Sequence, residues 1–279
     1  MVFVANHPYG VLDGIVTAWL VSKARPDFVV LTHIVLGRAP EAAGFILPVD
    51  FSGTAEAERT NLASRAAARA QLAKGGAVVV FPAGAISTAP DALGLQPAVD
   101  GRWQPFVSQL IQRSKATVIP IWFAGQNSRL FQIASHVSQT LRLSLIFHEV
   151  RARIGATLPV VIGAPIPFAS IAEIRDRQAL ADELRAQVYA LASLAPALGE
   201  SRHRVGNCCP SFRFREGRRA GSNTAERLWG LLPFESNRRE CGRLQTALSR
   251  SASSVRCSLI RPRASFAILV SSRLLGFLR

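Results

Sequence analysis

Two residues near the start of the chain, His7 and Asp13, have the types and the spacing of a general base with a carboxylate partner. The residues between them include Pro8 and Gly10, which favour a tight turn. Such a turn can bring the imidazole and the carboxylate together. A carboxylate that bonds one ring nitrogen fixes the tautomer and leaves the other nitrogen free to take a proton. The alternative is that Asp13 only caps a helix and that His7 is a turn residue.

The elements around this pair follow from the apolar pattern. Residues 2–5 form a short apolar run of the kind found in a buried strand, and residues 15–21 predict a helix. His7 is therefore expected to leave the end of a strand, and Asp13 to stand at the start of a helix.

The rest of the first 198 residues alternates between strand-like and helix-like segments. Strands are predicted at 28–31, 44–49, 77–81, 117–123 and 159–163, and helices at 55–74, 105–113, 128–136, 140–151 and 171–194. Residues 77–81 are apolar on both faces, which is typical of a central strand, whereas Pro120 favours a sheet edge or a bulge. This order predicts one α/β domain over residues 1–198, with a central, mainly parallel sheet flanked by helices.

Residues 199–279 have a different composition. They contain 16 Arg and five Glu, without Lys or Asp, and so carry +11 of the net charge of +15. All four cysteines lie there too, which leaves residues 1–198 without a thiol nucleophile. We expect a poorly structured tail that arose by translation in the wrong frame or as an unselected extension. The alternative is a basic arm for membrane or nucleic acid, although no recognisable RNA-binding pattern accompanies it.

Two further segments place polar or flexible residues after predicted strands. Phe81 and Pro82 end the central strand, and Gly84 allows backbone N–H groups to approach a phosphate or a developing oxyanion. Asn127 and Arg129 follow the strand at 117–123, where polar side chains can face a site. The simpler interpretations are an ordinary turn in the first case, and a helix capped by the serine at position 128 in the second.

Taken together, these motifs resemble those of the glycerolipid acyltransferases, the lysophosphatidate acyltransferase superfamily. Residues 6–13 read Asn-His-Pro-x-Gly-x-x-Asp, with five residues between His and Asp where the family usually has four. This spacing and the Phe-Pro-Ala-Gly sequence at 81–84 are similar to the hemolysin-like branch, which includes lyso-ornithine lipid acyltransferases. Ala83 and Ala85 depart from the family pattern, because many members carry a glutamate at one of these places.

The resemblance implies transfer of a fatty acyl group from acyl-CoA or acyl carrier protein to the hydroxyl of a lysolipid, lysophosphatidate or lyso-ornithine lipid. His7 would be the general base and Asp13 would orient it, with no metal and no cofactor besides the thioester co-substrate. The protein would bind the inner face of the cytoplasmic membrane peripherally and would not bind nucleic acid. The residues expected to contact substrate are Asn6, Gly10, Arg59, Phe81, Pro82, Gly84, Asn127 and Arg129.

Several alternatives remain open. The motif begins almost at residue 1, so we expect a fragment of a longer acyltransferase or a start assigned too late; a minimal enzyme is the alternative. A fragment of this kind could bind lipid without turnover. A thioesterase could use the same His–Asp pair with water as the acceptor. A serine hydrolase is not expected, because the chain has no Gly-x-Ser-x-Gly sequence.

Overall fold

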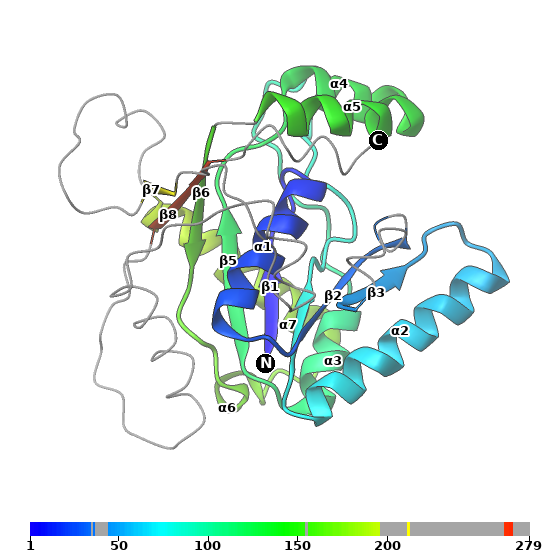
Figure 1. Cartoon of the computed structure of the whole chain (residues 1–279), viewed down its shortest axis with the longest axis vertical. Coiled ribbons are helices and arrows are strands. Elements are labelled where there is room, and N and C mark those ends of the chain that lie inside the picture. Colours follow the sequence, from blue (N-terminus) through cyan, green and yellow to red (C-terminus); the bar gives the residue numbers. More distant parts are fainter. Residues whose placement is uncertain (35, 37–43, 154–155, 196–210, 213–264, 270–279) are drawn as a thin grey trace, which may run out of the picture.

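The computed structural model describes residues 1–34, 36, 44–153, 156–195, 211–212 and 265–269. Its centre is a sheet whose strands lie in the order β3-β2-β4-β1-β5-β6-β8-β7 (Figure 1). The strands are β1 (Val2–Ala5), β2 (Phe28–His33), β3 (Ile46–Val49), β4 (Ala77–Val80), β5 (Val118–Phe123), β6 (Thr157–Ile162), β7 (Ser211–Phe212) and β8 (Ser265–Leu269). Strands β1 to β5 pair in parallel, whereas β6 is antiparallel to β5 and to β8. The predicted α/β class with a mainly parallel sheet is confirmed.

Helices cover both faces of the sheet, as a mainly parallel sheet requires. On one face α1 (Val11–Ala24) buries its apolar side against alternate residues of the central strands, such as Phe3 and Ala5 of β1. On the other face lie α2 (Ala55–Ala73), α3 (Phe106–Ser114) and α7 (Arg177–Ala190), which pack on Val2 and Val4. The alternation along β1 follows from the period of two residues in a strand.

The carboxyl ends of β1, β4 and β5 meet at one edge of the sheet, because these three neighbouring strands are parallel. The turn to α1, the loop after β4 and the loop after β5 therefore start side by side. Beyond this edge, α4 (Arg129–Val137) and α5 (Gln139–Ala152) form a helical hairpin at the top of Figure 1. The sequence-predicted site residues fall on these segments, except for Arg59, which lies on α2.

One prediction about an individual element was wrong, and one was correct in part. The helix expected over 171–194 is divided into α6 (Phe168–Ile171), α7 and a 3-10 helix, η2 (Leu191–Leu194). Asp176 causes the break, because its side chain accepts the amide N–H of Ala179 and so begins a new helix. Pro120 does not mark a sheet edge, since β5 lies between β1 and β6, but the predicted alternative of a bulge fits: the antiparallel pairing goes from Val118–Ile166 to Ile121–Ile162, which leaves one extra residue on the segment opposite Pro120. The paired stretch with β6 begins only at Ile121, so the missing amide hydrogen of the proline costs no ladder bond there.

The predicted division at residue 198 concerns a tail of which the structure describes only β7 and β8. These two short strands continue the sheet beyond β6. The other residues of 199–279 lie outside the described residues, and the domain boundary itself stays a prediction.

Candidate active site

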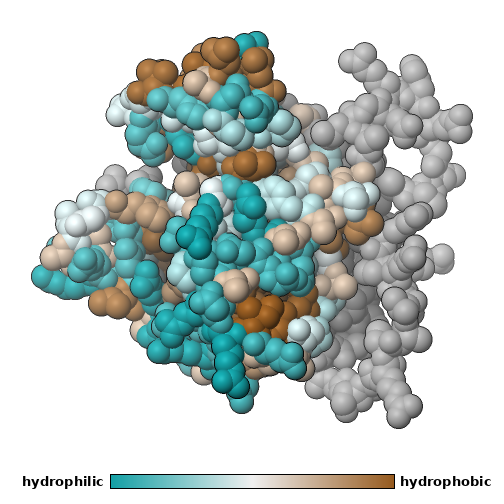
Figure 2. All heavy atoms as spheres, turned by 180° about the vertical axis from the view of Figure 1, so that it is seen from behind, coloured by the Kyte–Doolittle hydropathy of each residue, from teal (hydrophilic) through white to brown (hydrophobic). Residues whose placement is uncertain are grey.

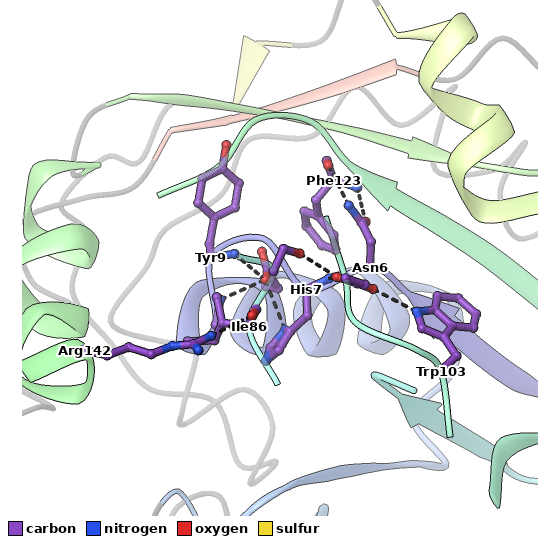
Figure 3. Close-up of polar contacts among 11 residues, drawn as sticks. Asn6, His7, Tyr9, Ile86, Trp103, Phe123 and Arg142 are labelled. Carbon is purple, nitrogen blue, oxygen red and sulfur yellow. Dashed lines mark hydrogen bonds and ion pairs between the residues drawn. The ribbon is translucent and has the colours of Figure 1, made fainter. Parts of the chain in front are cut away.

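The structure brings His7 and Asp13 together at the end of β1 (Figure 3). The Nδ1 atom of His7 lies 3.1 Å from Oδ2 of Asp13. Asp13 is fully buried, whereas the His7 side chain keeps 18% of its surface exposed. The carboxylate therefore assigns the ring hydrogen to Nδ1 and leaves Nε2 as the nitrogen that can take a proton from a bound hydroxyl or water.

Asp13 has a second set of contacts, with the backbone of the turn. Its Oδ2 atom accepts hydrogen bonds from the amides of Tyr9 at 2.8 Å and Gly10 at 2.9 Å. Helix α1 begins at Val11, so Asp13 lies inside its first turn and is not the N-cap residue, which is Gly10. The alternative of a capping role is thus correct in part: one carboxylate oxygen both closes the helix start and faces the imidazole.

Burial determines the electrostatics of this carboxylate. Removal from water raises the pKa of Asp13, and the hydrogen bond and charge of His7, with the two amides, oppose that rise. A carboxylate that faces an imidazole can stabilise the imidazolium that forms when the ring takes a proton in a reaction. The pair therefore suits a step in which His7 becomes protonated for part of the cycle.

Gly10 is required by the backbone and by its neighbour. Its φ angle is +79°, and a Cβ atom at this position would lie 2.6 Å from Cδ1 of Ile86. The loop after β4 can thus pack directly on the turn that carries His7. This contact gives Gly10 a role in shaping the turn.

The loop after β4 forms the second wall of the site. The ring of Phe81 lies 4.4 Å from the His7 ring, centroid to centroid. The carbonyl of Pro82 accepts the amide of Gln104, and the amide of Gly84 donates to the carbonyl of Phe81. The N–H of Gly84 itself is therefore used within the turn, and the expected contact of this loop with a ligand stays a prediction.

A second buried carboxylate, Asp100, holds the backbone of His7. Its Oδ1 accepts the amide of His7 at 3.1 Å and the hydroxyl of Ser87, and its Oδ2 accepts the indole N–H of Trp103 at 2.9 Å. The carbonyl of His7 in turn accepts the amide of Ser87 at 2.8 Å. Asp100 therefore connects the β1 turn, the loop after β4 and the approach to α3 around the candidate base.

Two residues of the turn fasten it to the end of β5. The side-chain amide of Asn6 donates to the carbonyl of Phe123 at 3.0 Å and accepts its N–H at 2.7 Å. The hydroxyl of Tyr9 donates to the carbonyl of Ala124 at 2.6 Å, and burial raises the pKa of this tyrosine to about 12. These bonds give Asn6 a positioning role beside the base, and its predicted contact with substrate stays a prediction.

Asn127 lies at the end of β5 and is only 2% exposed. Neither its Oδ1 nor its Nδ2 atom has a hydrogen-bond partner among the described residues. A buried amide without internal partners is costly unless it meets a ligand or water. The predicted substrate contact by Asn127 is therefore compatible with its position. The next residue, Ser128, caps α4, as the simpler interpretation of this segment predicted.

The predicted arginines lie on the surface. Arg59 is exposed on the second turn of α2, and Arg129 is exposed while its Nε donates to the carbonyl of Leu93. A third arginine, Arg142 of α5, contacts the loop after β4, because its Nη2 donates to the carbonyl of Ile86 at 2.6 Å. Figure 3 shows its side chain extending toward the turn that carries His7. The structure thus adds a half-buried cation that sequence reasoning missed.

Sequence analysis missed three residues of this site for the same reason. Asp100, Tyr9 and Arg142 act through contacts between segments that are far apart in the chain. The clearest signal available was the spacing of Asp100 and Trp103, because a carboxylate three residues before a buried indole is placed to accept its N–H. Within the described residues, no three His, Cys, Asp or Glu side chains lie together as a metal site would need.

The comparisons with known proteins agree with the class that the motifs and the site define. The chain is similar to the lyso-glycine lipid O-acyltransferase of Phocaeicola vulgatus, with 23% identity over 197 residues, which cover 68% of this chain and 67% of that protein. No family model matches the chain. At this identity the similarity supports a lysolipid acyltransferase family in broad terms. Among the described helices, none has the length and apolar character needed to cross a bilayer.

Proposed function

We propose that this protein is an O-acyltransferase that esterifies the hydroxyl of a lysolipid with a fatty acyl group from a thioester donor. The observation that carries the proposal is the His7–Asp13 pair at 3.1 Å, with Nε2 of His7 left for the acceptor. The similarity to an O-acyltransferase supports the reaction class. The donor is acyl-CoA or acyl carrier protein, and neither a metal nor another cofactor takes part.

The reaction proceeds by direct attack. Nε2 of His7 takes the proton of the acceptor hydroxyl as its oxygen attacks the thioester carbonyl. Asp13 stabilises the imidazolium that forms. The tetrahedral intermediate then expels the thiolate, which receives the proton from His7, so that an ester and a free thiol are the products. Residues 1–198 contain no cysteine, and the described site places no serine in contact with the His7 ring, so no acyl-enzyme is invoked.

The oxyanion of this intermediate needs hydrogen-bond donors near the base. Ser87 and Gly84 use their amides on the carbonyls of His7 and Phe81. Ala85 and Ile86 lie between them on the same loop, and their amides donate to no other described residue. We assign these two N–H groups to the oxyanion, a contribution that is typically about 10²–10³-fold in turnover.

The reaction class is tested by following thiol release from acyl-CoA and from acyl carrier protein with and without a lysolipid. We expect release to depend on the acceptor and to match ester formation mole for mole. A thioesterase would release thiol equally fast without lysolipid and would form free fatty acid. A fragment that only binds lipid would retain lysolipid without releasing thiol. Either result would refute the proposed reaction.

The acceptor is expected to carry an anionic group on its head. The similar enzyme of Phocaeicola vulgatus is named for a lyso-glycine lipid acceptor. The motifs indicate lysophosphatidate or lyso-ornithine lipid as the acceptor. Arg142 is a cation in direct contact with the loop after β4, since it bonds the carbonyl of Ile86. Burial lowers the pKa of its guanidinium, which nevertheless stays charged at neutral pH. We therefore propose that Arg142 binds the anionic head group of the acceptor.

Replacing Arg142 with Gln is expected to reduce kcat/KM for an anionic lysolipid by about 10–100-fold, as loss of a charged hydrogen bond implies. Arg59→Gln and Arg129→Gln serve as matched controls, because both side chains are exposed. We expect these two to lose at most a few-fold, in line with surface charges. A larger loss for either control than for Arg142→Gln would move the head-group contact to that arginine. Comparing lysophosphatidate, lyso-ornithine lipid and lyso-glycine lipid as acceptors would identify the preferred head group.

The place of action is part of the same proposal. A lysolipid acceptor resides in a membrane, so we propose that the protein acts at the inner face of the cytoplasmic membrane, attached to its surface.

A further inference from the structure

The hairpin of α4 and α5 exposes an unusual number of large apolar side chains. Those more than one third exposed are Leu130, Val137, Leu141, Leu143 and Phe147, with exposed fractions from 46% to 73%. Figure 2 shows hydrophobic side chains gathered at the top of the molecule, over the position of this hairpin. Contiguous apolar surface of this kind marks an interaction site more often than scattered single residues do.

Helix α5 exposes apolar side chains as well as burying them. Ile146 and Val150 are buried, and the helix packs on α4 and α1. Leu141, Leu143 and Phe147 each keep close to half of their surface exposed. Leu143 and Phe147 are four residues apart and so lie on the same side of the helix. A surface helix ordinarily exposes polar residues, so these exposed apolar side chains call for a partner.

The apolar surface continues onto the loop between Ser87 and Asp100. Leu93 and Leu95 of this loop are 58% and 66% exposed. The loop packs on α4, because the carbonyl of Leu93 accepts the Nε of Arg129. Both ends of the loop contact His7, through Ser87 and Asp100. The apolar surface thus extends from the walls of the candidate active site.

Charge indicates the nature of the partner. Residues 129–153 contain four arginines and a single acidic residue, Glu149. Glu149 is buried and bonds Ser128, so it offers no negative charge to the outside. Arg151 is exposed near the end of α5. A surface with apolar side chains and unopposed cations matches the interface of an anionic bilayer, where apolar groups insert and basic groups meet lipid head groups.

We propose that the outer face of the α4–α5 hairpin, with the tip of the loop at Leu93 and Leu95, is the surface by which this protein docks on an anionic membrane. The proposal rests on the proposed function, since a lysolipid acceptor must leave the bilayer to reach His7. Arg142 connects the hairpin with the candidate active site, because Leu141 and Leu143 beside it are each nearly half exposed while its guanidinium reaches the carbonyl of Ile86. A lysolipid could therefore move from the membrane along α5 to the base.

The test compares vesicle binding by the full chain and by a triple variant, Leu141→Ser, Leu143→Ser and Phe147→Ser. The vesicles contain phosphatidylcholine and phosphatidylglycerol, and binding is measured by co-sedimentation. We expect the triple variant to bind about ten-fold or more weakly, because binding scales with the apolar area inserted. Leu62→Ser is the matched control: Leu62 is 62% exposed on α2, away from the hairpin, and its loss should change nothing.

A charge variant supplies independent evidence should the triple variant fold poorly. Arg151→Glu should weaken binding to these vesicles by about five-fold or more at low salt, and the difference should disappear at high salt. Equal binding by the parent and both variants would overturn the proposal, as would a parent that ignores the vesicles. A parent that self-associates through this face, with the triple variant monomeric and vesicle binding unchanged, would also overturn it.

Turnover separates this proposal from the proposed function. With a short-chain lysolipid dispersed as monomers, the triple variant should match the parent, because the acceptor no longer has to leave a bilayer. If neither the parent nor the triple variant converts the lysolipid while their vesicle binding differs, the docking surface stands and the proposed reaction fails. If both turn over equally and bind vesicles equally, the reaction stands and the docking surface is refuted.

Discussion

Replacing His7 with Ala is expected to reduce turnover by about 10²–10⁴-fold, the usual contribution of a positioned general base. The loss should appear in kcat, because Nε2 takes the proton in the transition state and contributes little to the binding of the acceptor. The side chain is 18% exposed and forms part of no core cluster, so the thermal midpoint should change little. Turnover is measured as acceptor-dependent thiol release, and unfolding by circular dichroism. Near-normal turnover in folded His7→Ala protein would remove His7 from the reaction.

Two replacements of Asp13 separate its roles. Asn at this position keeps an oxygen to accept the amides of Tyr9 and Gly10, so the start of α1 should persist. It lacks the negative charge that stabilises the imidazolium, and turnover should fall by about 10²-fold or more. Asp13→Ala removes both functions and should also cost about 1 kcal/mol of helix stability. If Asp13→Asn is fully active and only Asp13→Ala is impaired, the carboxylate serves the helix alone.

Replacing Asp100 with Asn is expected to lower kcat by about 10²-fold, the scale of a small misplacement of a catalytic group. The carboxylate accepts three donors: the amide of His7, the hydroxyl of Ser87 and the indole of Trp103. An Asn side chain has one accepting oxygen, so its NH₂ group must face either the His7 amide or the indole. One buried donor is then left without an acceptor, at a cost of about 1–3 kcal/mol in stability.

The measurement must distinguish positioning from simple destabilisation. A positioning role predicts that kcat falls per mole of folded protein, while KM for the acyl donor stays near the parent value. Asp91→Asn is the matched control, because Asp91 lies on the same loop, is only partly buried, and accepts the loop amides of Leu95 and Gln96. It should be fully active. An Asp100→Asn protein with unchanged kcat after correction for unfolded material would show that Asp100 supports only the fold.

Sequence alone was sufficient for the parts of this protein that depend on local pattern. The apolar runs and the helical periodicities gave the α/β class, the central position of the strand at Ala77–Val80 and most helices. The His7-Pro8-x-Gly10 turn predicted that a base and a carboxylate could meet, since all the atoms involved lie within seven residues. Errors came where one side chain overrode a pattern, as Asp176 did by beginning α7 inside an expected helix.

Tertiary structure decided the contacts between segments distant in sequence. Asp100 bonds a backbone amide 93 residues away, and Arg142 reaches a carbonyl 56 residues away, and no local periodicity encodes either bond. Tertiary structure also showed that the side chain of Asn6 bonds Phe123, a contact 117 residues away that sequence alone did not predict. The sequence by itself determined which residues could do chemistry at the end of β1. Only the packing of the parallel strands β1, β4 and β5 determined which other groups hold that histidine in place. The same packing determined which loops and helices lie around it.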